Sequence, residues 1–367
     1  MPRPELFTPI QLGGITLPNR IVVSPMCQYS ADDGCMNDWH FIHLGHLAYS
    51  GAGLLVVEAT HVTREGRITH HCAGLYSEHN EASIKRVIDN CRRLTKNPIG
   101  IQIGHAGRKA SSQVPWEGRQ WLRPGQSPWQ TVAPSPIPYG DGWHTPRELK
   151  VEEIKGLVES FVQAAQRALR IGFDLLELHS AHGYLLHQFQ SPLANRRKDE
   201  YGKDRMKFPL EVARAVRDAW PRDKALGARI SAHDWVEGGL GPDDAVPYAS
   251  ELKRIGFDYV CVSSGAMVPQ AHISVAPGYQ VPFAEKVKRA VEVKVQTVGM
   301  IADPDQAQDI VASGKADMVV MARAFLDNPR WVWHAAEHFG VELEYPPQYA
   351  RSRHDLWPGT KLARKRC

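Results

Sequence analysis

The sequence lacks any run of about 18 apolar residues, the length that a membrane-spanning helix needs. Its first residues, Met1 to Phe7, also lack the apolar segment of a secretory signal peptide. These two absences predict a cytoplasmic protein that makes no use of a membrane.

Cysteine is sparse, and its spacing is irregular. The six cysteines include no Cys-x-x-Cys pair and stand at Cys27, Cys35, Cys72, Cys91, Cys261 and Cys367. Because disulfide frameworks are typical of small secreted chains, we expect these thiols to be reduced.

A large excess of one charge is also missing. The 44 basic and 40 acidic residues give a net charge of +4, and four of the positive side chains, Lys361, Arg364, Lys365 and Arg366, lie in the last seven residues. A nucleic-acid-binding protein usually gathers basic residues on one face of its folded body, so we expect no nucleic-acid partner. The apolar content of 43% and the charged content of 23% are ordinary for a folded globular chain.

Eight short runs, most of them apolar throughout, are bounded by turn residues. They are Ile21–Val23, Leu54–Glu58, Ile99–Ile103, Leu175–Leu178, Leu226–Ile230, Tyr259–Ser263, Val295–Val298 and Met318–Met321. Continuous apolar runs indicate strands that are buried on both faces, as in a parallel sheet.

Amphipathic segments alternate with these strands and end in similar turns. Helices are expected over Val151–Arg170, Phe208–Trp220, Asp243–Arg254 and Asp305–Ala312. Gly172, Gly256 and Gly314 follow three of them and suit the left-handed conformation that ends a helix. Eight strand–helix units favour a closed (β/α)₈ TIM barrel, with an open doubly wound sheet as the alternative.

Residues 1–345 are expected to form this single barrel domain, and residues 346–367 a C-terminal tail. The segment His105–Leu149, rich in Pro, Gly and Trp, is too long for an ordinary connection. We expect it to cover a site or a subunit contact.

Active sites of such barrels lie at the C-terminal ends of the strands. His179, His182 and Tyr184 follow the fourth strand, so two N–H donors and a phenolic proton would meet at the barrel mouth. A second interpretation makes the two histidines metal ligands, but only Glu58 offers a third ligand at the other strand ends considered. Gly299 and Ala322-Arg323 follow the seventh and eighth strands, where barrels often bind a phosphate.

Three motifs together carry a family resemblance. They are Ser24-Pro25-Met26-Cys27-Gln28-Tyr29, Gly100-Ile101-Gln102-Ile103-Gly104-His105-Ala106-Gly107-Arg108-Lys109-Ala110 and His179-Ser180-Ala181-His182-Gly183-Tyr184-Leu185. The chain resembles the Old Yellow Enzyme family, and within it the thermophilic-like subgroup that includes xenobiotic reductases. The similarity runs in order from about Leu6 to Arg351.

The resemblance implies a TIM barrel that holds FMN without a covalent bond. NADPH or NADH would reduce the flavin, an activated alkene or nitro compound would reoxidise it, and no metal would take part. The implied flavin contacts are Pro25, Met26, Cys27, Ala59, Gln102, Arg229, Gly299, Ala322 and Arg323. Of these, Arg323 would bind the phosphate, Arg229 would face the pyrimidine edge, and Cys27 would tune the flavin's potential.

On the substrate side, the resemblance implies that His179 and His182 bind a carbonyl or nitro oxygen. Tyr184 would protonate the α-carbon, and Tyr29 would line the substrate pocket. Arg351 resembles a tail arginine that relatives insert into a neighbouring subunit's site, which implies a homodimer or a homotetramer.

The chain departs from the family pattern at three places, one of which is a tail beyond Arg351 that is longer and more basic than in many relatives. Ala322 stands where relatives commonly have glycine. Because alanine disfavours positive φ values, we expect a negative φ at this position. The loop after Gly202 is shorter than usual. A metal-dependent barrel hydrolase and a non-catalytic flavin-binding barrel stay as rival hypotheses.

Overall fold

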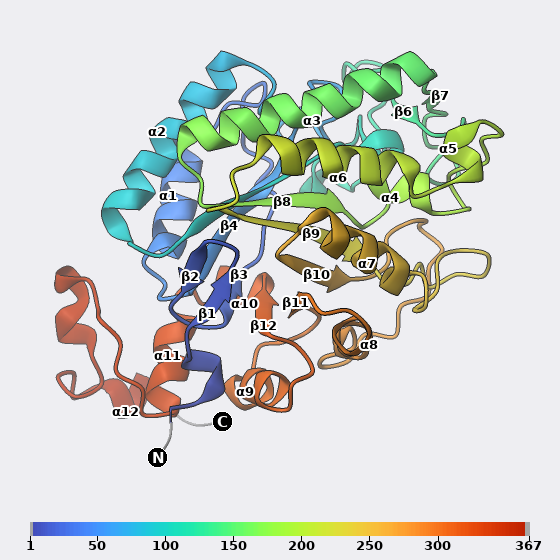
Figure 1. The fold of residues 1–367 in the computed structure, drawn as a ribbon. Helices are drawn as coiled ribbons and strands as arrows, with labels where there is room; N and C mark the ends of the chain where they lie inside the picture. The colour runs from blue at the N-terminus through green and yellow to red at the C-terminus, as the bar shows by residue number, and fades with distance from the viewer. Residues whose placement is uncertain (1–2, 364–367) are drawn as a thin grey trace.

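Each of the eight predicted runs forms a strand, and the strands pair in parallel around a closed barrel (Figure 1). The computed structural model describes residues 3–363. In order around the barrel the strands are β3 (Ile21–Val23), β4 (Leu54–His61), β5 (Ile99–Gly104), β8 (Leu175–Ser180), β9 (Ala225–Ser231), β10 (Tyr259–Ser263), β11 (Lys294–Thr297) and β12 (Met318–Met321). β12 pairs with β3, for example Val319 with Ile21, so the sheet has no free edge. The predicted (β/α)₈ barrel is confirmed, and the open sheet is excluded.

Helices surround the barrel, and at least one follows each strand (Figure 1). Their bounds are α1 (Asp38–Ala48), α2 (Glu78–Leu94), α3 (Val151–Ile171), α4 (Leu185–Gln190), α5 (Glu200–Lys203), α6 (Lys207–Ala219), α7 (Ala245–Ile255), α8 (Val281–Ala290), α9 (Pro304–Ala312), α10 (Arg323–Asp327), α11 (Trp331–His338) and α12 (Thr360–Ala363). None of the helices that the structure describes is long and apolar enough to cross a membrane.

The predicted helix ends agree closely with the structure, because the residues next to each helix determine where it ends. Gly172 and Gly256 end α3 and α7 at φ values of +97° and +103°. The predicted start of α7 at Asp243 was early by two residues. Residues 241–244 instead form a turn, in which Gly241 N donates to a carboxylate oxygen of Asp244 at 2.7 Å.

A hairpin that the sequence did not predict lies at the N-terminal end of the barrel, the end at which the parallel strands begin. β1 (Ile10–Leu12) and β2 (Ile15–Leu17) pair antiparallel. Their fully buried Leu12 and Leu17 join an apolar cluster with the first residues of barrel strands, such as Leu54. The hairpin therefore covers the N-terminal end and leaves the C-terminal end for a site.

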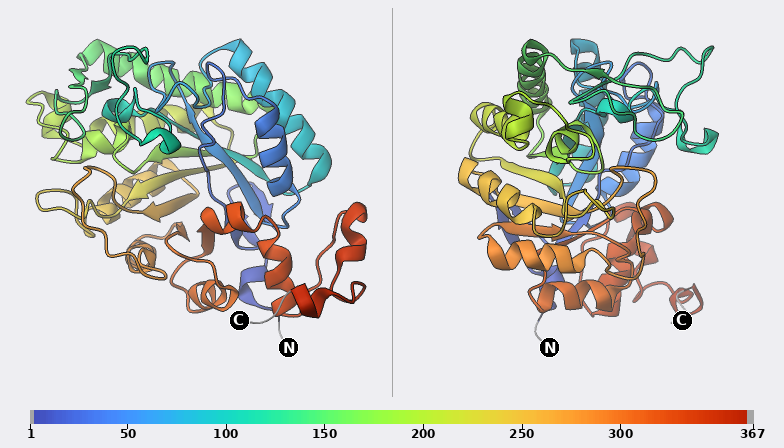
Figure 2. Two further views of the ribbon diagram at one scale, coloured as in Figure 1. Left: turned by 180° about the vertical axis from the view of Figure 1, so that it is seen from behind. Right: turned by 90° about the vertical axis from the view of Figure 1, so that its right-hand side faces the viewer.

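Two segments lie outside the strand–helix repeat. Residues 105–149, teal to green in Figure 2, form a long excursion that contains only the short parallel pair β6 (Val132–Ala133) and β7 (Arg147–Glu148) and two 3₁₀ turns. The C-terminal tail includes a 3₁₀ helix, Pro347–Ser352, whose Tyr349 stacks on Tyr49 with ring centroids 5.5 Å apart. Arg364, Lys365, Arg366 and Cys367 lie outside the described residues.

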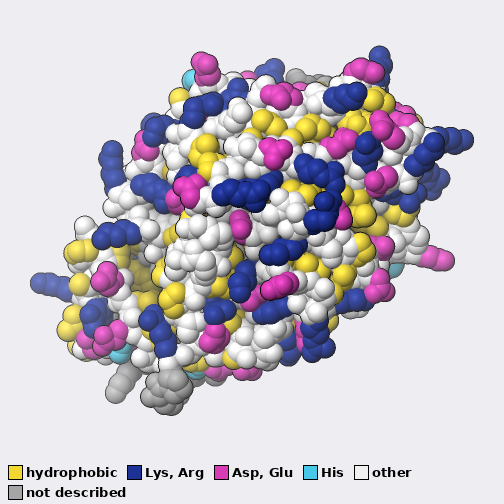
Figure 3. Space-filling view, in the orientation of Figure 1, with side chains coloured by type: hydrophobic (Ala, Val, Ile, Leu, Met, Phe, Trp, Pro, Cys, Tyr) yellow, Lys and Arg dark blue, Asp and Glu magenta, His cyan; other side chains and the backbone are white. Residues whose placement is uncertain are grey.

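Charges of both signs are interspersed over the face shown in Figure 3. The five described cysteines, Cys27, Cys35, Cys72, Cys91 and Cys261, are all free thiols.

Candidate active site

A cavity of about 500 Å³ opens at the C-terminal ends of the strands. Its lining includes five of the predicted site residues, which come from distant parts of the chain: His182, Arg229, Gly299, Ala322 and Arg323. The volume lies within the range of small-molecule and cofactor sites.

Arg229 reaches the cavity from β9 and is 8% exposed. Its Nη1 donates to Ser24 Oγ at 3.0 Å, while its Nε is buried and has no hydrogen-bond partner among residues 3–363. A buried guanidinium N–H without a partner costs free energy, so this atom calls for an acceptor in the cavity.

Glu177 lies inside the barrel, where it contacts another predicted residue, Gln102, and is affected by the charge of Arg229. Gln102 Nε2 donates to Glu177 Oε1 at 2.7 Å, and the Tyr259 hydroxyl donates to Oε2 at 2.9 Å. Burial raises the pKa of Glu177, although the charge of Arg229 opposes the rise. Glu177 was not among the predicted site residues. The feature that could have indicated it is a carboxylate in the middle of the apolar run Leu175–Leu178.

Gly299 and Ala322 follow β11 and β12, where the sequence predicts a phosphate site, and each has a φ value that suits its residue type. Gly299 has φ +110°, and a Cβ there would lie 3.0 Å from Gln280 Nε2. Ala322 has φ −109°, so alanine meets the condition set by its replacement of glycine. Arg323 begins α10 directly after it.

The loop after β3 holds Pro25, Met26 and Cys27. Cys27 packs in a small cluster with Tyr29, Tyr184 and the buried Cys72. Burial raises the pKa of the Cys27 thiol well above its ordinary value, and Cys72 and Glu58 add to the rise, so the thiol is neutral. A hydrogen bond from the Ala59 backbone also reaches this thiol.

Glu58 does not join the two histidines of the metal hypothesis. One of its oxygens accepts from Gln28 N at 3.1 Å, and the other lies 3.4 Å from His40 Nε2. Within the described part of the chain, no group of three or more His, Cys, Asp or Glu side chains is arranged to hold a metal ion.

His179, His182 and Tyr184 converge, as predicted. The His179 ring centroid lies 5.2 Å from that of His182 and 4.8 Å from that of Tyr184. Burial and the charge of Arg229 lower both histidine pKa values well below 6.5, and burial raises the pKa of Tyr184 well above 10. The histidines are therefore neutral at pH 7, and the tyrosine carries its proton.

Hydrogen bonds define the free nitrogen of each ring. His179 Nδ1 accepts from Ala181 N at 3.3 Å, which leaves the proton on Nε2. His182 Nε2 shares a hydrogen bond of 2.7 Å with Ser263 Oγ, so Nδ1 is the ring nitrogen left for a ligand.

We call residues 181–184 the tyrosine turn. His182 and Gly183 have consecutive left-handed φ values of +57° and +68°. Tyr184 N donates to Ala181 O at 3.1 Å, and Lys109 Nζ donates to His182 O at 2.9 Å. Burial, together with the charges of nearby arginines, lowers the pKa of Lys109 to about 7.

Two predicted residues remain, and neither of them lines the cavity. Tyr29 belongs to the Cys27 cluster, and its ring meets Trp116 of the long excursion edge-on at 6.1 Å. The excursion thus reaches the site, as expected. Arg351 is exposed in the tail and does not line the cavity of its own chain.

Gly183→Ala is expected to damage the tyrosine turn. A Cβ at Gly183 would lie 2.4 Å from Ala266 O, besides forcing a left-handed alanine, so we expect a loss of about 2–4 kcal/mol in the free energy of unfolding. Gly172→Ala is the control, since Gly172 is also left-handed but its Cβ would meet no atom within 4 Å. Urea unfolding of both variants checks this; equal losses would contradict the steric argument.

The profile of the NADH:flavin oxidoreductase / NADH oxidase family matches residues 5–342. The chain belongs to this family. The predicted resemblance to the Old Yellow Enzymes, which this family contains, is confirmed.

Relatives match over nearly the whole chain. An NADPH dehydrogenase of Geobacillus thermodenitrificans is 44% identical over 94% of this chain and 98% of its own, and one of Listeria monocytogenes is 40% identical over 95% and 99%. The solved structure of morphinone reductase in complex with tetrahydroNAD has 29% identity and a TM-score of 0.76, over 94% of each chain.

The family member described here is an oxidoreductase whose cofactor is FMN, with a reduced nicotinamide nucleotide as hydride donor. The cavity suits that cofactor. The unpartnered Nε of buried Arg229 offers a donor to a flavin ring, and Arg323 offers a positive charge to a phosphate.

Proposed function

We propose that this family member is an ene-reductase that uses NADPH or NADH to reduce the C=C bond of α,β-unsaturated carbonyl or nitro compounds. The observation that carries this proposal is the convergence of His179, His182 and Tyr184 beside the cavity. Two neutral imidazoles and a protonated phenol are the donors that such a reaction needs.

We propose that nine residues hold FMN, of which the last four in the chain line the cavity. They are Pro25, Met26, Cys27, Ala59, Gln102, Arg229, Gly299, Ala322 and Arg323. These residues would hold FMN, which would supply the transfer of a hydride from the nicotinamide to the β-carbon of the activated alkene.

The chain's own groups act on the substrate's oxygen and α-carbon. His179 Nε2–H and His182 Nδ1–H donate to the carbonyl or nitro oxygen, where negative charge develops. The His182 proton sits on Nδ1 when Nε2 accepts from the Ser263 hydroxyl, which is 2.7 Å away. Tyr184 gives its proton to the α-carbon, and Tyr29 lines the pocket.

The experiment that tests the function follows both half-reactions in one cuvette. The purified protein is bleached with NADPH without oxygen, and cyclohexenone is then added. A flavin band that bleaches and returns supports the proposal. A band that bleaches but does not return with any enone or nitroalkene refutes it and favours a flavin-binding barrel without this activity.

His179→Ala is expected to slow reoxidation by cyclohexenone about 10²–10³-fold, because one donor to the developing oxyanion is lost. It should also weaken phenol binding, measured from the flavin spectrum. His46→Ala is the matched control, since His46 is an exposed histidine of α1. Unchanged values for both reoxidation and phenol binding would refute the role of His179.

The tail is proposed to complete a neighbouring site in a homodimer or homotetramer. Support comes from Arg351, which is exposed and outside its own cavity. We expect Arg351→Ala and Tyr184→Phe proteins, each slow alone, to regain activity when dissociated and reassembled together. Additive activity of the mixture would contradict the proposal.

A further inference from the structure

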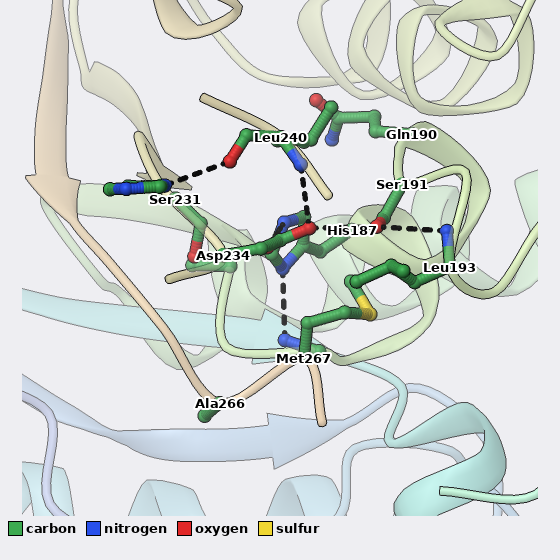
Figure 4. A network of polar contacts seen from close by, with 12 residues as sticks. His187, Gln190, Ser191, Leu193, Ser231, Asp234, Leu240, Ala266 and Met267 are labelled. Atoms are coloured by element: carbon green, nitrogen blue, oxygen red, sulfur yellow. Dashed lines mark hydrogen bonds and ion pairs between the residues drawn. The ribbon is translucent and has the colours of Figure 1, made fainter. Parts of the chain in front are cut away.

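A buried histidine–aspartate pair lies directly behind the tyrosine turn. His187 of α4 and Asp234, three residues beyond β9, are 1% and 0% exposed. Nε2 of the imidazole lies 3.1 Å from Oδ1 of the carboxylate (Figure 4). Neither atom makes a hydrogen bond of good geometry with any residue that the structure describes, so each has the other as its polar neighbour.

The proton of His187 has one possible place. Its Nδ1 accepts a hydrogen bond from Gly183 N at 2.9 Å, so this nitrogen carries no proton. The ring proton is therefore on Nε2, where it faces Asp234. The carboxylate fixes the tautomer, and the tautomer provides the acceptor for the backbone of the tyrosine turn.

Asp234 is held as an anion. The Ser191 hydroxyl and Leu240 N donate to its Oδ2 at 2.7 Å and 2.9 Å (Figure 4). Burial alone would raise the pKa of Asp234, but His187 and these two donors bring it below its ordinary value. The glycine-rich loop Gly238–Gly241, which contains Leu240, supplies part of this charge stabilisation.

The position of Gly183 makes this arrangement matter for the reaction. Gly183 lies between His182 and Tyr184, and both it and His182 have left-handed φ. A left-handed histidine is unfavourable unless neighbouring contacts hold it. The other groups of the turn are held too, since His182 N donates to Ser231 Oγ at 3.0 Å and Gln188 Nε2 donates to Gly183 O at 2.7 Å.

We propose that Asp234 and His187 are positioning residues for proton transfer: the carboxylate sets the imidazole tautomer, and the imidazole holds the turn that aims Tyr184 and His182. Neither residue touches the substrate. The proposal rests on the proposed function, because it requires Tyr184 to act on the substrate.

Asp234→Asn tests the proposal with almost no change of shape. A single amide oxygen cannot accept from both His187 and the pair formed by Ser191 and Leu240. Either a buried N–H of Leu240 loses its acceptor, or the His187 proton moves to Nδ1, where it opposes Gly183 N–H. We expect reoxidation by cyclohexenone to slow about 10–100-fold in the FMN-loaded variant, because small misplacements of reacting groups cost that much.

A double-mutant cycle separates positioning from general damage. Once the turn is displaced, Tyr184 contributes less, so Tyr184→Phe should slow the Asp234→Asn protein at least tenfold less than it slows the wild type. Fully multiplicative effects, or reoxidation within threefold of wild type, would overturn the proposal. If Tyr184→Phe alone has no effect, the proposed function fails instead.

Asp317→Asn is the matched control. Asp317 is also buried and accepts from a backbone N–H, that of Val295 at 2.8 Å, but it directly precedes β12, at the opposite end of the barrel. We expect this variant to lose stability while its reoxidation rate stays within threefold of wild type.

Two further measurements keep the proposal testable if Asp234→Asn does not fold. ¹⁵N NMR of labelled histidine in the wild-type holoenzyme should show an Nε2–H tautomer for His187; an Nδ1–H tautomer overturns the proposal. His187→Asn keeps an acceptor oxygen near the Nδ1 position, whereas His187→Leu does not. We expect the asparagine variant to reoxidise at least fivefold faster than the leucine variant, and equal rates would contradict the role of the imidazole.

Discussion

The Tyr184→Phe variant is expected to bleach with NADPH like the wild type but to regain its flavin band about 10²–10⁴-fold more slowly with cyclohexenone, the range for a lost general acid. The reason lies in the site. Burial keeps the Tyr184 phenol protonated, and its ring lies 4.8 Å from that of His179, which binds the oxygen in our proposal. Phenylalanine keeps the ring and removes only the proton.

Tyr139 provides a matched control for this change. Lys109 Nζ lies between the two rings, 4.7 Å from the centroid of Tyr139 and 5.0 Å from that of Tyr184. Tyr139→Phe therefore removes a second phenol from the same surroundings and should change the reoxidation rate less than threefold. Stopped-flow measurement of both half-reactions decides; equal slowing of the two variants would mean that Tyr184 has no special role.

The barrel could be predicted from the sequence because its signals are local. Tyr259–Ser263 and Met318–Met321 were predicted to the residue, since each is a β-rich run between a helix-ending glycine turn and a loop. The eight runs set the predicted number of strands, and the similar turns at Gly172 and Gly256 indicated the strand–helix repeat. The hairpin Ile10–Leu17 was not predicted because each of its strands has a polar residue, Gln11 or Thr16, in the middle instead of a continuous apolar run.

The site was predictable only where a motif marks it. His179, His182 and Tyr184 lie within six residues, so a strand end and a resemblance were enough. Glu177, His187 and Asp234 each contact a residue of another segment of the chain, and no single segment encodes such a contact. Their visible signal is a charged or polar residue in an otherwise buried segment, and that signal does not say which partner it meets.

Acidification from pH 7.5 to pH 5.5 is expected to lower the free energy of unfolding by at least about 4 kcal/mol, which is the contribution of the buried histidines His61, His105 and His179. His43 and His182, whose pKa values burial also lowers, add to this loss. Burial, with nearby positive charge, lowers the pKa of His61 to about 3; burial lowers that of His105 to about 4 and that of His179 well below 6.5. Both His61 nitrogens lack a hydrogen-bond partner among the described residues, so a proton there would be uncompensated.

The sign follows from proton counting. Below about pH 6.5 each histidine takes up a proton in the unfolded chain but not in the folded one, so stability falls as the pH falls from 6.5 toward the folded pKa values. At pH 5.5 each contributes about 1.4 kcal/mol, whatever its folded pKa below 5. The total is a large share of the roughly 5–15 kcal/mol of a typical domain.

Urea unfolding at pH 7.5 and 5.5, with FMN in fixed excess, measures this loss. His61→Leu removes one of these groups and should reduce the pH-dependent loss by about 1.4 kcal/mol, because leucine has no proton to gain in the unfolded chain. His272→Gln, at an exposed histidine, should leave the loss unchanged. A loss below about 1 kcal/mol in the wild type, or one that His61→Leu does not reduce, would show that these imidazoles reach water or a buried partner when protonated.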